Sequence, residues 1–218
     1  NSGTEAIEGA LKLAKRAVGR SELIGAVNSY HGSTHGALSL LGSEHQKVGY
    51  RPLLPNTRFI RFNSEEDLSL ITTKTAAVLL ETIQGGAGFI LPENDFLKKV
   101  KDRCEATGAL LILDEIQPGF GRTGRFFGFE YFNVKPDIIV LGKGMGGGLP
   151  VGAFTASHEL MSLLEDNPKL GHITTFGGNP LIAAACLATL KVIRDSKILQ
   201  EIPEKNQEIT QTLNFIKK

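Results

Sequence analysis

The chain has 218 residues, a 41% share of hydrophobic residues, and 24 basic against 23 acidic residues. This length and composition are ordinary for a globular chain of one large or two small domains that buries a core. The charged residues are spread along the chain, so there is no basic arm or stripe, and we expect no nucleic-acid partner.

Two further absences in the sequence narrow the class of protein. No run of eighteen apolar residues occurs and the N-terminus lacks the order of a signal peptide, so we expect no membrane span and a cytoplasmic protein. Cys104 and Cys186 lie in no C-x-x-C pair and beside no histidine cluster, which predicts reduced thiols, no disulfide framework and no metal site.

The predicted elements alternate between helices and strands along the chain. Apolar residues at helical spacing predict a helix over about 4–18, preceded by Ser2 and Glu5 at capping-box spacing. Apolar runs predict strands at 23–27, 58–62, 76–81, 109–114 and 138–141, and apolar stripes predict helices over 96–107 and 179–193. We therefore predict an α/β fold with a mostly parallel central sheet flanked by helices.

Asp114 is the first candidate functional residue, because it ends the otherwise apolar segment 110–114. Ligands bind at the carboxyl edge of such sheets, and an unpaired charge there would be costly. Asp114 therefore needs a partner. The structural alternative is that it caps the next turn or pairs with an arginine such as Arg122.

Lys143 is the second candidate, since it follows the strand 138–141 and lies among the glycines of segment 142–148. Glycine allows backbone and ligand to approach closely. A lysine in a dry cleft has a lowered pKa, which makes it a nucleophile toward aldehydes. The alternative is a solvated lysine in a flexible glycine loop.

The glycines also invite two nucleotide-binding interpretations, which the spacing tests. The phosphate-loop pattern fails because Asp137 and Gly144 occupy two of its required positions around Lys143. Segment 119–124 matches G-x-G-x-x-G, but Gln117 and Pro118 separate it from its strand and no acidic residue ends the next strand. A nicotinamide or flavin enzyme is therefore disfavoured.

Seven motifs become specific when they are considered together and in order. They are Asn-Ser-Gly-Thr-Glu-Ala at 1–6, Tyr-His-Gly at 30–32, Glu-x-x-Gln-Gly at 81–85, Asp-Glu-x-Gln-x-Gly-x-Gly-Arg-Thr-Gly at 114–124, Gly-Lys-Gly at 142–144, Gly-Gly-Leu-Pro at 147–150 and Thr-Phe-Gly-Gly-Asn-Pro at 175–180. In this order they resemble the signatures of class III aminotransferases, the acetylornithine and ornithine aminotransferases above all. The resemblance covers residues 1–195.

The resemblance implies the large domain of a fold type I transferase that depends on pyridoxal 5'-phosphate. Lys143 would hold this cofactor as a Schiff base and shuttle the substrate proton, and Asp114 would pair with the protonated ring nitrogen. Gly3 and Thr4 would hold the phosphate at a helix N-terminus. Tyr30 and Ile116 would cover the two ring faces, or serve as ordinary core, and Gln117 would bond the phenolic oxygen.

The resemblance also implies a homodimer, because Thr175 would reach the phosphate bound by the neighbouring subunit. His31 and His172 lie in or near the motifs, but no proton-transfer role can be assigned to them, and packing or hydrogen bonding is the better interpretation. Residues 1–195 are predicted to form the cofactor-binding domain without its N-terminal segment. Residues 196–218 would begin a linker or helix toward a small domain that is missing here.

Two positions depart from the ornithine-type pattern, which has an arginine at the position of Ser33 and a glutamate at that of Gly86. A serine cannot replace a permanently charged bidentate group, so these departures leave the amino donor open. The predicted reaction transfers an amino group from an ω-amine or amino acid, with acetylornithine or ornithine first, to a keto acid such as 2-oxoglutarate. The alternatives are an aminomutase or racemase reaction on the same cofactor, or an incomplete fragment that only binds cofactor.

Overall fold

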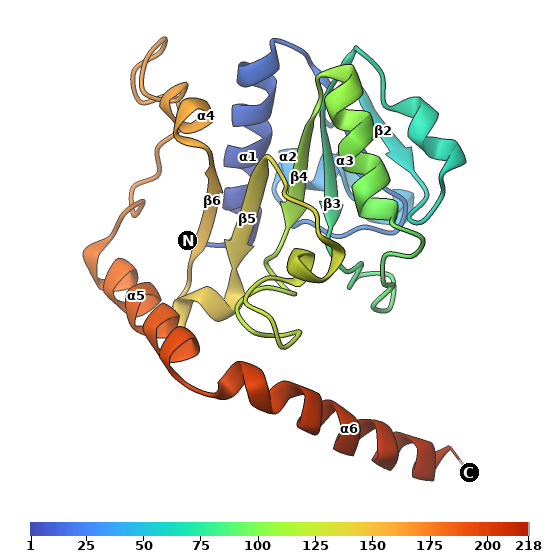
Figure 1. The fold of residues 1–218 in the computed structure, drawn as a ribbon. Coiled ribbons are helices and arrows are strands. Elements are labelled where there is room, and N and C mark those ends of the chain that lie inside the picture. Colours follow the sequence, from blue (N-terminus) through green and yellow to red (C-terminus); the bar gives the residue numbers. More distant parts are fainter. Residues whose placement is uncertain (218) are drawn as a thin grey trace.

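The protein forms one six-stranded sheet with helices on both faces (Figure 1). The computed structural model describes residues 1–217. The strands are β1 Glu22–Ala26, β2 Thr57–Ile60, β3 Thr75–Glu81, β4 Leu110–Asp114, β5 Ile138–Gly142 and β6 Gly152–Ala156. The helices are α1 Gly3–Val18, α2 His35–Ser39, α3 Phe96–Thr107, α4 His158–Ser162, α5 Pro180–Asp195 and α6 Ile198–Ile216.

The strand order is β2-β1-β3-β4-β5-β6, in which the first five strands are parallel and β6 pairs antiparallel with β5. The chain leaves β1 toward β2 on one side and continues from β3 on the other side. The order therefore reverses between β1 and β3, and in open α/β sheets ligands bind at the carboxyl edge beside such a reversal. The mostly parallel α/β sheet predicted from the sequence is confirmed.

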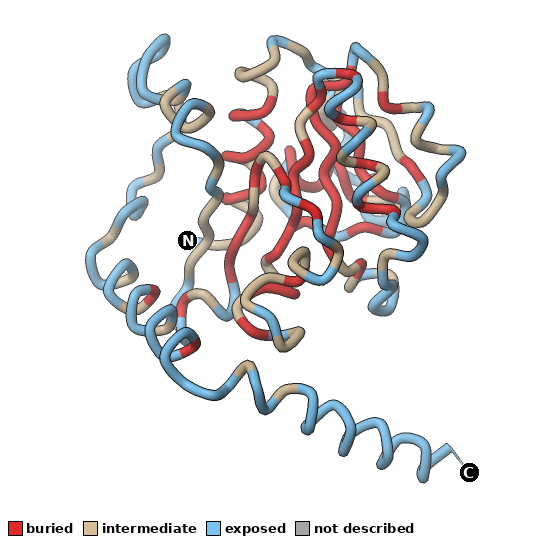
Figure 2. The backbone as a smooth tube through the Cα atoms, in the orientation of Figure 1, coloured by how far each residue is buried: buried red, intermediate tan, exposed pale blue. Residues whose placement is uncertain are grey.

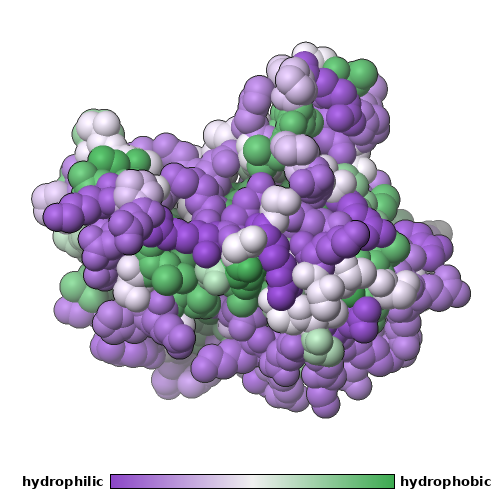
Figure 3. Space-filling view, turned by 90° about the horizontal axis from the view of Figure 1, so that it is seen from above, coloured by the Kyte–Doolittle hydropathy of each residue, from purple (hydrophilic) through white to green (hydrophobic). Residues whose placement is uncertain are grey.

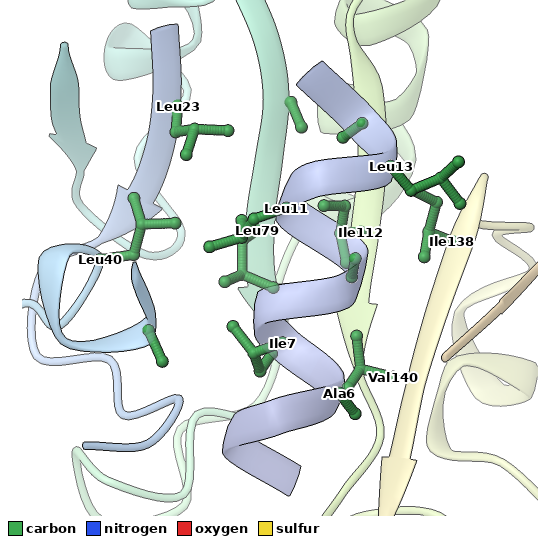
Figure 4. Close-up of a cluster of buried hydrophobic side chains, with 14 of the residues drawn as sticks. Ala6, Ile7, Leu11, Leu13, Leu23, Leu40, Leu79, Ile112, Ile138 and Val140 are labelled. Atoms are coloured by element: carbon green, nitrogen blue, oxygen red, sulfur yellow. The ribbon is translucent and has the colours of Figure 1, made fainter. Parts of the chain in front are cut away.

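Two hydrophobic cores cover the two faces of the sheet. All seven residues of β3 are buried, as a parallel strand between two layers of helices requires. Leu79 faces the core under α1, whereas Leu80 faces the core under α3. Figure 2 shows the buried backbone concentrated in the central strands, and Figure 4 shows Leu11 and Leu13 of α1 lying over the sheet.

Two local details differ from the sequence-based expectation. β6 was not predicted, because its sequence Gly-Ala-Phe-Thr-Ala has no continuous apolar run and none of its residues is fully buried. The helix α1 begins within one residue of the expected start, but the predicted capping box does not form. The Ser2 hydroxyl donates to Glu5 Oε2 at 3.3 Å instead of accepting from the helix backbone.

The C-terminal helices are far less covered than the central sheet. α5 buries only Cys186 and Ile193, and α6 buries no residue (Figure 2). The predicted boundary after residue 195 coincides with the end of α5, and the division into domains stays a prediction. The face seen from above is mostly hydrophilic with scattered hydrophobic patches (Figure 3). Among the described residues, no helix is both long and apolar enough to span a membrane.

Candidate active site

A cavity of about 380 Å³ lies at the carboxyl edge of the sheet, within the size range of small-ligand sites. Its walls come from the start of α1 and from the segments that follow β1, β3, β4 and β5. Seven of the eight predicted site residues line it: Gly3, Thr4, Tyr30, Asp114, Ile116, Gln117 and Lys143. The topology thus brings together residues up to 140 positions apart in the sequence.

Asp114 is buried at the base of this cavity, and its partner is His31. The two residues form a bond of 2.8 Å between His31 Nδ1 and Asp114 Oδ2, and the backbone N–H of Ile116 donates to Oδ1 at 3.0 Å. The side chain that pairs with Asp114 is therefore a histidine and not an arginine such as Arg122. The other ring nitrogen of His31, Nε2, is buried and makes no hydrogen bond.

The N-terminus of α1 contributes Gly3 and Thr4 to the lining of the cavity. The first bond within the helix runs from the Ala6 N–H to the Ser2 carbonyl at 3.2 Å, so the amides of Gly3 and Thr4 have no partner inside the helix. A 16-residue helix concentrates partial positive charge at this end. These two amides can therefore bind an anionic group.

The Thr4 hydroxyl already has partners in the structure. It lies 2.7 Å from the Thr34 hydroxyl and accepts from the Thr34 N–H at 3.2 Å. The Thr4 side chain thereby fixes the segment that follows β1 against α1. Besides the phosphate-binding role that the resemblance implies for Thr4, its hydroxyl therefore links two walls of the cavity.

Ile116 closes one side of the cavity and approaches α1 closely. A Cβ on Gly3 would lie 2.6 Å from Ile116 Cδ1, so a side chain at this position would require Ile116 to shift. Tyr30, which is 49% exposed, lines the cavity from the segment after β1, and its hydroxyl lies 3.4 Å from Ser33 Oγ.

Lys143 reaches the cavity from an unusual backbone conformation. Its φ is +43°, a left-handed value that is uncommon and strained for a residue with a side chain. Its Nζ donates to Gln117 Oε1 at 3.3 Å. The lysine is exposed in this chain, so the dry cleft expected around it is not formed by residues 1–217 alone.

Glu81 and Ile83 also line the cavity, although the sequence analysis gave them no role. Glu81 ends β3 and pairs in register with Asp114 at the end of β4. Its place at the end of a fully buried strand is the signal that could have identified it, because Asp114 was found in this way.

The next residue after Asp114 is also a buried acid, and it faces away from the cavity. Glu115 accepts three hydrogen bonds, from the Thr82 hydroxyl at 2.6 Å and from the N–H groups of Gly128 at 2.8 Å and Phe129 at 2.9 Å. Burial raises the pKa of this carboxyl, and the three donors oppose that rise. Glu115 thus attaches the loop before β5 to the end of β4.

Two predicted residues lie outside the cavity. Thr175 is exposed in the segment before α5 and does not line this cavity. His172 stacks edge-on against Phe154 at 5.7 Å, and burial lowers its pKa. His172 thus has the packing contact expected from the sequence, and the role of Thr175 across a subunit boundary stays a prediction.

The structure accounts for one of the two departures from the ornithine-type pattern. A Cβ on Gly86 would lie 3.1 Å from Tyr30 Cβ and 3.4 Å from the Asn28 carbonyl oxygen. A side chain at this position requires Tyr30 to shift. The observed position of Tyr30 therefore depends on the absence of a side chain at Gly86.

Comparison with known proteins decides the family. The model of the family "Aminotransferase class-III" matches residues 1–218. This chain belongs to the class III aminotransferases. Members of the family depend on pyridoxal 5'-phosphate. The resemblance inferred from the seven motifs is thus confirmed at the level of the family.

Two similar relatives are enzymes whose names refer to semialdehydes. The [LysW]-aminoadipate semialdehyde/glutamate semialdehyde transaminase of Sulfolobus acidocaldarius is 41% identical over 98% of this chain and 54% of its own length. The Sulfurisphaera tokodaii enzyme of the same name is 38% identical over 95% of this chain and 53% of its own length. The chain therefore spans about half the length of the curated relatives that it matches.

Solved structures share the fold. The ornithine aminotransferase of Toxoplasma gondii, described with partial occupancy of PLP at its active site, matches with a TM-score of 0.89 and 31% identity. The match covers 98% of this chain and 52% of that one. An S-selective transaminase from Arthrobacter sp. matches with a TM-score of 0.87 and 25% identity over 100% of this chain and 53% of its own.

The described residues contain no group of three or more histidine, cysteine, aspartate or glutamate side chains arranged to hold a metal ion. The chemistry of the cavity is that of one lysine, two buried acids and one histidine.

Proposed function

We propose that this chain is the cofactor-binding part of a pyridoxal-phosphate-dependent aminotransferase. The observation that carries the proposal is the single cavity lined by Lys143, Asp114 and the start of α1. Three features of this cavity match the three binding groups of the cofactor. The free α1 amides suit its phosphate, the buried carboxylate suits its ring nitrogen, and the lysine suits its aldehyde.

Asp114 would hold the protonated ring nitrogen. His31 and the Ile116 N–H each engage one of its carboxylate oxygens, so the carboxylate has a fixed orientation before anything binds. Bound pyridoxal phosphate supplies an aldehyde carbon and an electron-withdrawing ring that stabilises negative charge on the neighbouring carbon. An oriented anion beside the ring nitrogen sustains that withdrawal.

Lys143 would carry the cofactor covalently and then move the proton. Its amine, once freed by an incoming donor amine, would remove a proton from the donor carbon that bears the transferred nitrogen and would return it to the carbon on the other side of that nitrogen. Gln117, which holds Lys143 Nζ at 3.3 Å, would turn its amide to the phenolic oxygen. Tyr30 and Ile116 would restrict the ring from opposite faces.

The substrate would be an amine at the end of a chain. The relatives named for aminoadipate and glutamate semialdehydes, and the neighbour named ornithine aminotransferase, support this choice. In such a reaction a primary amine becomes an aldehyde while a keto acid such as 2-oxoglutarate becomes an amino acid. Acetylornithine and ornithine are the first donors to test, although Ser33 and Gly86 differ from the ornithine-type pattern.

The working protein would be a homodimer. Thr175 is exposed and does not line the cavity, and the resemblance implies that it reaches the phosphate bound by a second subunit. A hydroxyl from the second subunit would complete the phosphate site that the α1 amides begin.

A screen of amino donors tests this proposal directly. The full-length protein is loaded with pyridoxal phosphate and incubated with 2-oxoglutarate and a series of ω-amines and amino acids. Mass spectrometry then follows glutamate and the aldehyde product. We expect equal amounts of the two products from a terminal amine. A rearranged or inverted donor without glutamate would indicate a mutase or racemase, and no product from any donor would contradict the proposal.

A further inference from the structure

We propose that Glu81 is a positioning residue that joins the two loops forming the Tyr30 side of the active-site cavity. Glu81 is the last residue of β3 and is only 7% exposed. The two loops follow β1 and β3 respectively, and both line the cavity. The inference rests on the proposed function for its catalytic meaning, but its structural part can be tested without any cofactor.

The two carboxylate oxygens of Glu81 bind different loops. Oε2 accepts a hydrogen bond of 3.2 Å from the N–H of Tyr30, which lies 51 positions away in the sequence. Oε1 accepts from the N–H groups of Gly85 at 3.1 Å and Gly86 at 3.3 Å. A group that accepts on both sides needs two acceptor oxygens, which a carboxylate has and an amide lacks.

Tyr30 depends on this anchor because its side chain has little else to hold it. The residue is 49% exposed, and its hydroxyl has only a long contact of 3.4 Å to Ser33. The loop after β3 approaches it so closely that a Cβ on Gly86 would lie 3.1 Å from Tyr30 Cβ. By fixing both backbones, Glu81 sets where the Tyr30 ring stands relative to the other residues that line the cavity.

Another hydrogen bond joins the same two loops outside the cavity. Gln84 Nε2 donates to the Val27 carbonyl at 2.7 Å. Gln84 does not line the cavity. Loss of the Glu81 bonds should therefore loosen the cavity wall without separating the loops or unfolding the domain.

The charge state of Glu81 makes the anchor sensitive to pH. Burial raises the pKa of its carboxyl above the ordinary range, His31 on the loop after β1 lowers it, and Asp114 at the end of β4 raises it. Both oxygens face N–H donors, so an added proton has no acceptor and must displace one of them. The N–H groups of Gly86 and Tyr30 bond to the ionised carboxylate and so lower its pKa against the effect of burial. Protonation weakens these bonds while the side chain stays buried, so the wall should loosen as pH falls through this pKa.

Amide hydrogen exchange on the cofactor-free full-length protein tests the anchor. We compare the wild type with Glu81→Gln, which keeps the size of the side chain but faces one loop with an NH₂ group. Exchange at Tyr30, Gly85 or Gly86 should become about tenfold faster or more, because a lost bond to a charged group is worth at least that factor.

Glu8→Gln is the matched control. Glu8 also bonds two backbone amides, those of Gly36 at 2.8 Å and Ala37 at 3.1 Å, but both bonds go to Oε1 alone. A glutamine therefore keeps them, and exchange in this variant should match the wild type. Equal protection of Tyr30, Gly85 and Gly86 in Glu81→Gln would overturn the role of Glu81.

Cofactor binding supplies the second readout. The dissociation constant of pyridoxal phosphate, measured by absorbance, should rise about tenfold in Glu81→Gln. The wild type should bind more weakly as pH falls through the raised pKa, and the variant should lose that component. Wild-type protein that binds no pyridoxal phosphate would refute the proposed function alone, since the exchange data still decide the role of Glu81.

If Glu81→Gln fails to fold, amide exchange of the wild-type protein at lowered pH tests the anchor instead. Exchange at the three amides, corrected for the intrinsic effect of pH, should then rise in the wild type on acidification while the amides of Gly36 and Ala37 keep their protection. A uniform response of all five amides would overturn the proposal.

Discussion

Two consecutive buried acids follow one another at the end of β4, one facing the cavity and the other facing the loop before β5. They differ in whether every polar group of their hydrogen-bond network has a partner. Glu115 faces the loop before β5 and accepts three hydrogen bonds from it and from Thr82. Asp114 faces the cavity, where its partner His31 still has a buried nitrogen without a bond. A fully bonded acid holds a structure together, whereas an acid whose network ends at a cavity is prepared for a ligand.

The largest expected effect is on the cavity side. Lys143→Ala should abolish covalent attachment of pyridoxal phosphate and the transaminase activity of the full-length protein, since no other lysine within residues 1–217 lines the cavity. Mass spectrometry after borohydride reduction and a donor assay measure both. Lys74→Ala, which changes an exposed lysine just before β3, should leave both intact. Attachment in the Lys143→Ala variant would mean that the site is assigned to the wrong residue.

The next effect separates attachment from proton transfer. Asp114→Ala should still attach the cofactor through Lys143 but slow removal of the substrate proton by a factor on the order of 1,000, as losing a preorganised charge does. Deuterium exchange at the donor carbon measures that step. Asp102→Ala, at an exposed acid on α3, is the control and should match the wild type. Unchanged exchange in the Asp114→Ala variant would remove this residue from the mechanism.

On the other side of β4, the expected effect is on stability. Glu115→Ala leaves Thr82, Gly128 and Phe129 without their acceptor and should lower the free energy of unfolding by about 3 kcal/mol. Denaturant unfolding measures this loss. The folded variant should still label at Lys143. A variant that keeps its stability but loses labelling would reverse the contrast between the two acids.

The smallest expected effect concerns pH. Burial raises the pKa of Glu115 in the folded protein, so its contribution to stability is complete below the ordinary carboxyl range and is lost as pH rises through the raised pKa. Glu115→Gln does not titrate, so the free energy of unfolding of this variant should fall less across that interval. A steeper fall in the variant than in the wild type would contradict the sign.

Much of the fold follows from local patterns in the sequence. The composition of the fully buried β3 and the apolar spacing of α1 indicate these two elements. The sequence predicts both within one residue of their observed starts. β6 was missed because an edge strand with a glycine and half-buried residues has no such pattern. The capping box failed because spacing alone does not say whether Ser2 bonds the backbone or Glu5.

The site was predicted less completely than the fold, for a physical reason. Lys143 and Asp114 stand at strand ends, which the sequence reveals. The bond between His31 and Asp114 joins residues 83 positions apart, and only the strand order brings them together. The anchoring contacts of Glu81 depend in the same way on two loops that are distant in sequence.

The central claim is that the cavity holds pyridoxal phosphate on one lysine. The most direct measurement is to mix the protein with the cofactor, reduce it with borohydride, and map the modified peptides by mass spectrometry. We expect one label, on Lys143. No label, or labels scattered over exposed lysines such as Lys74 and Lys169, would contradict it.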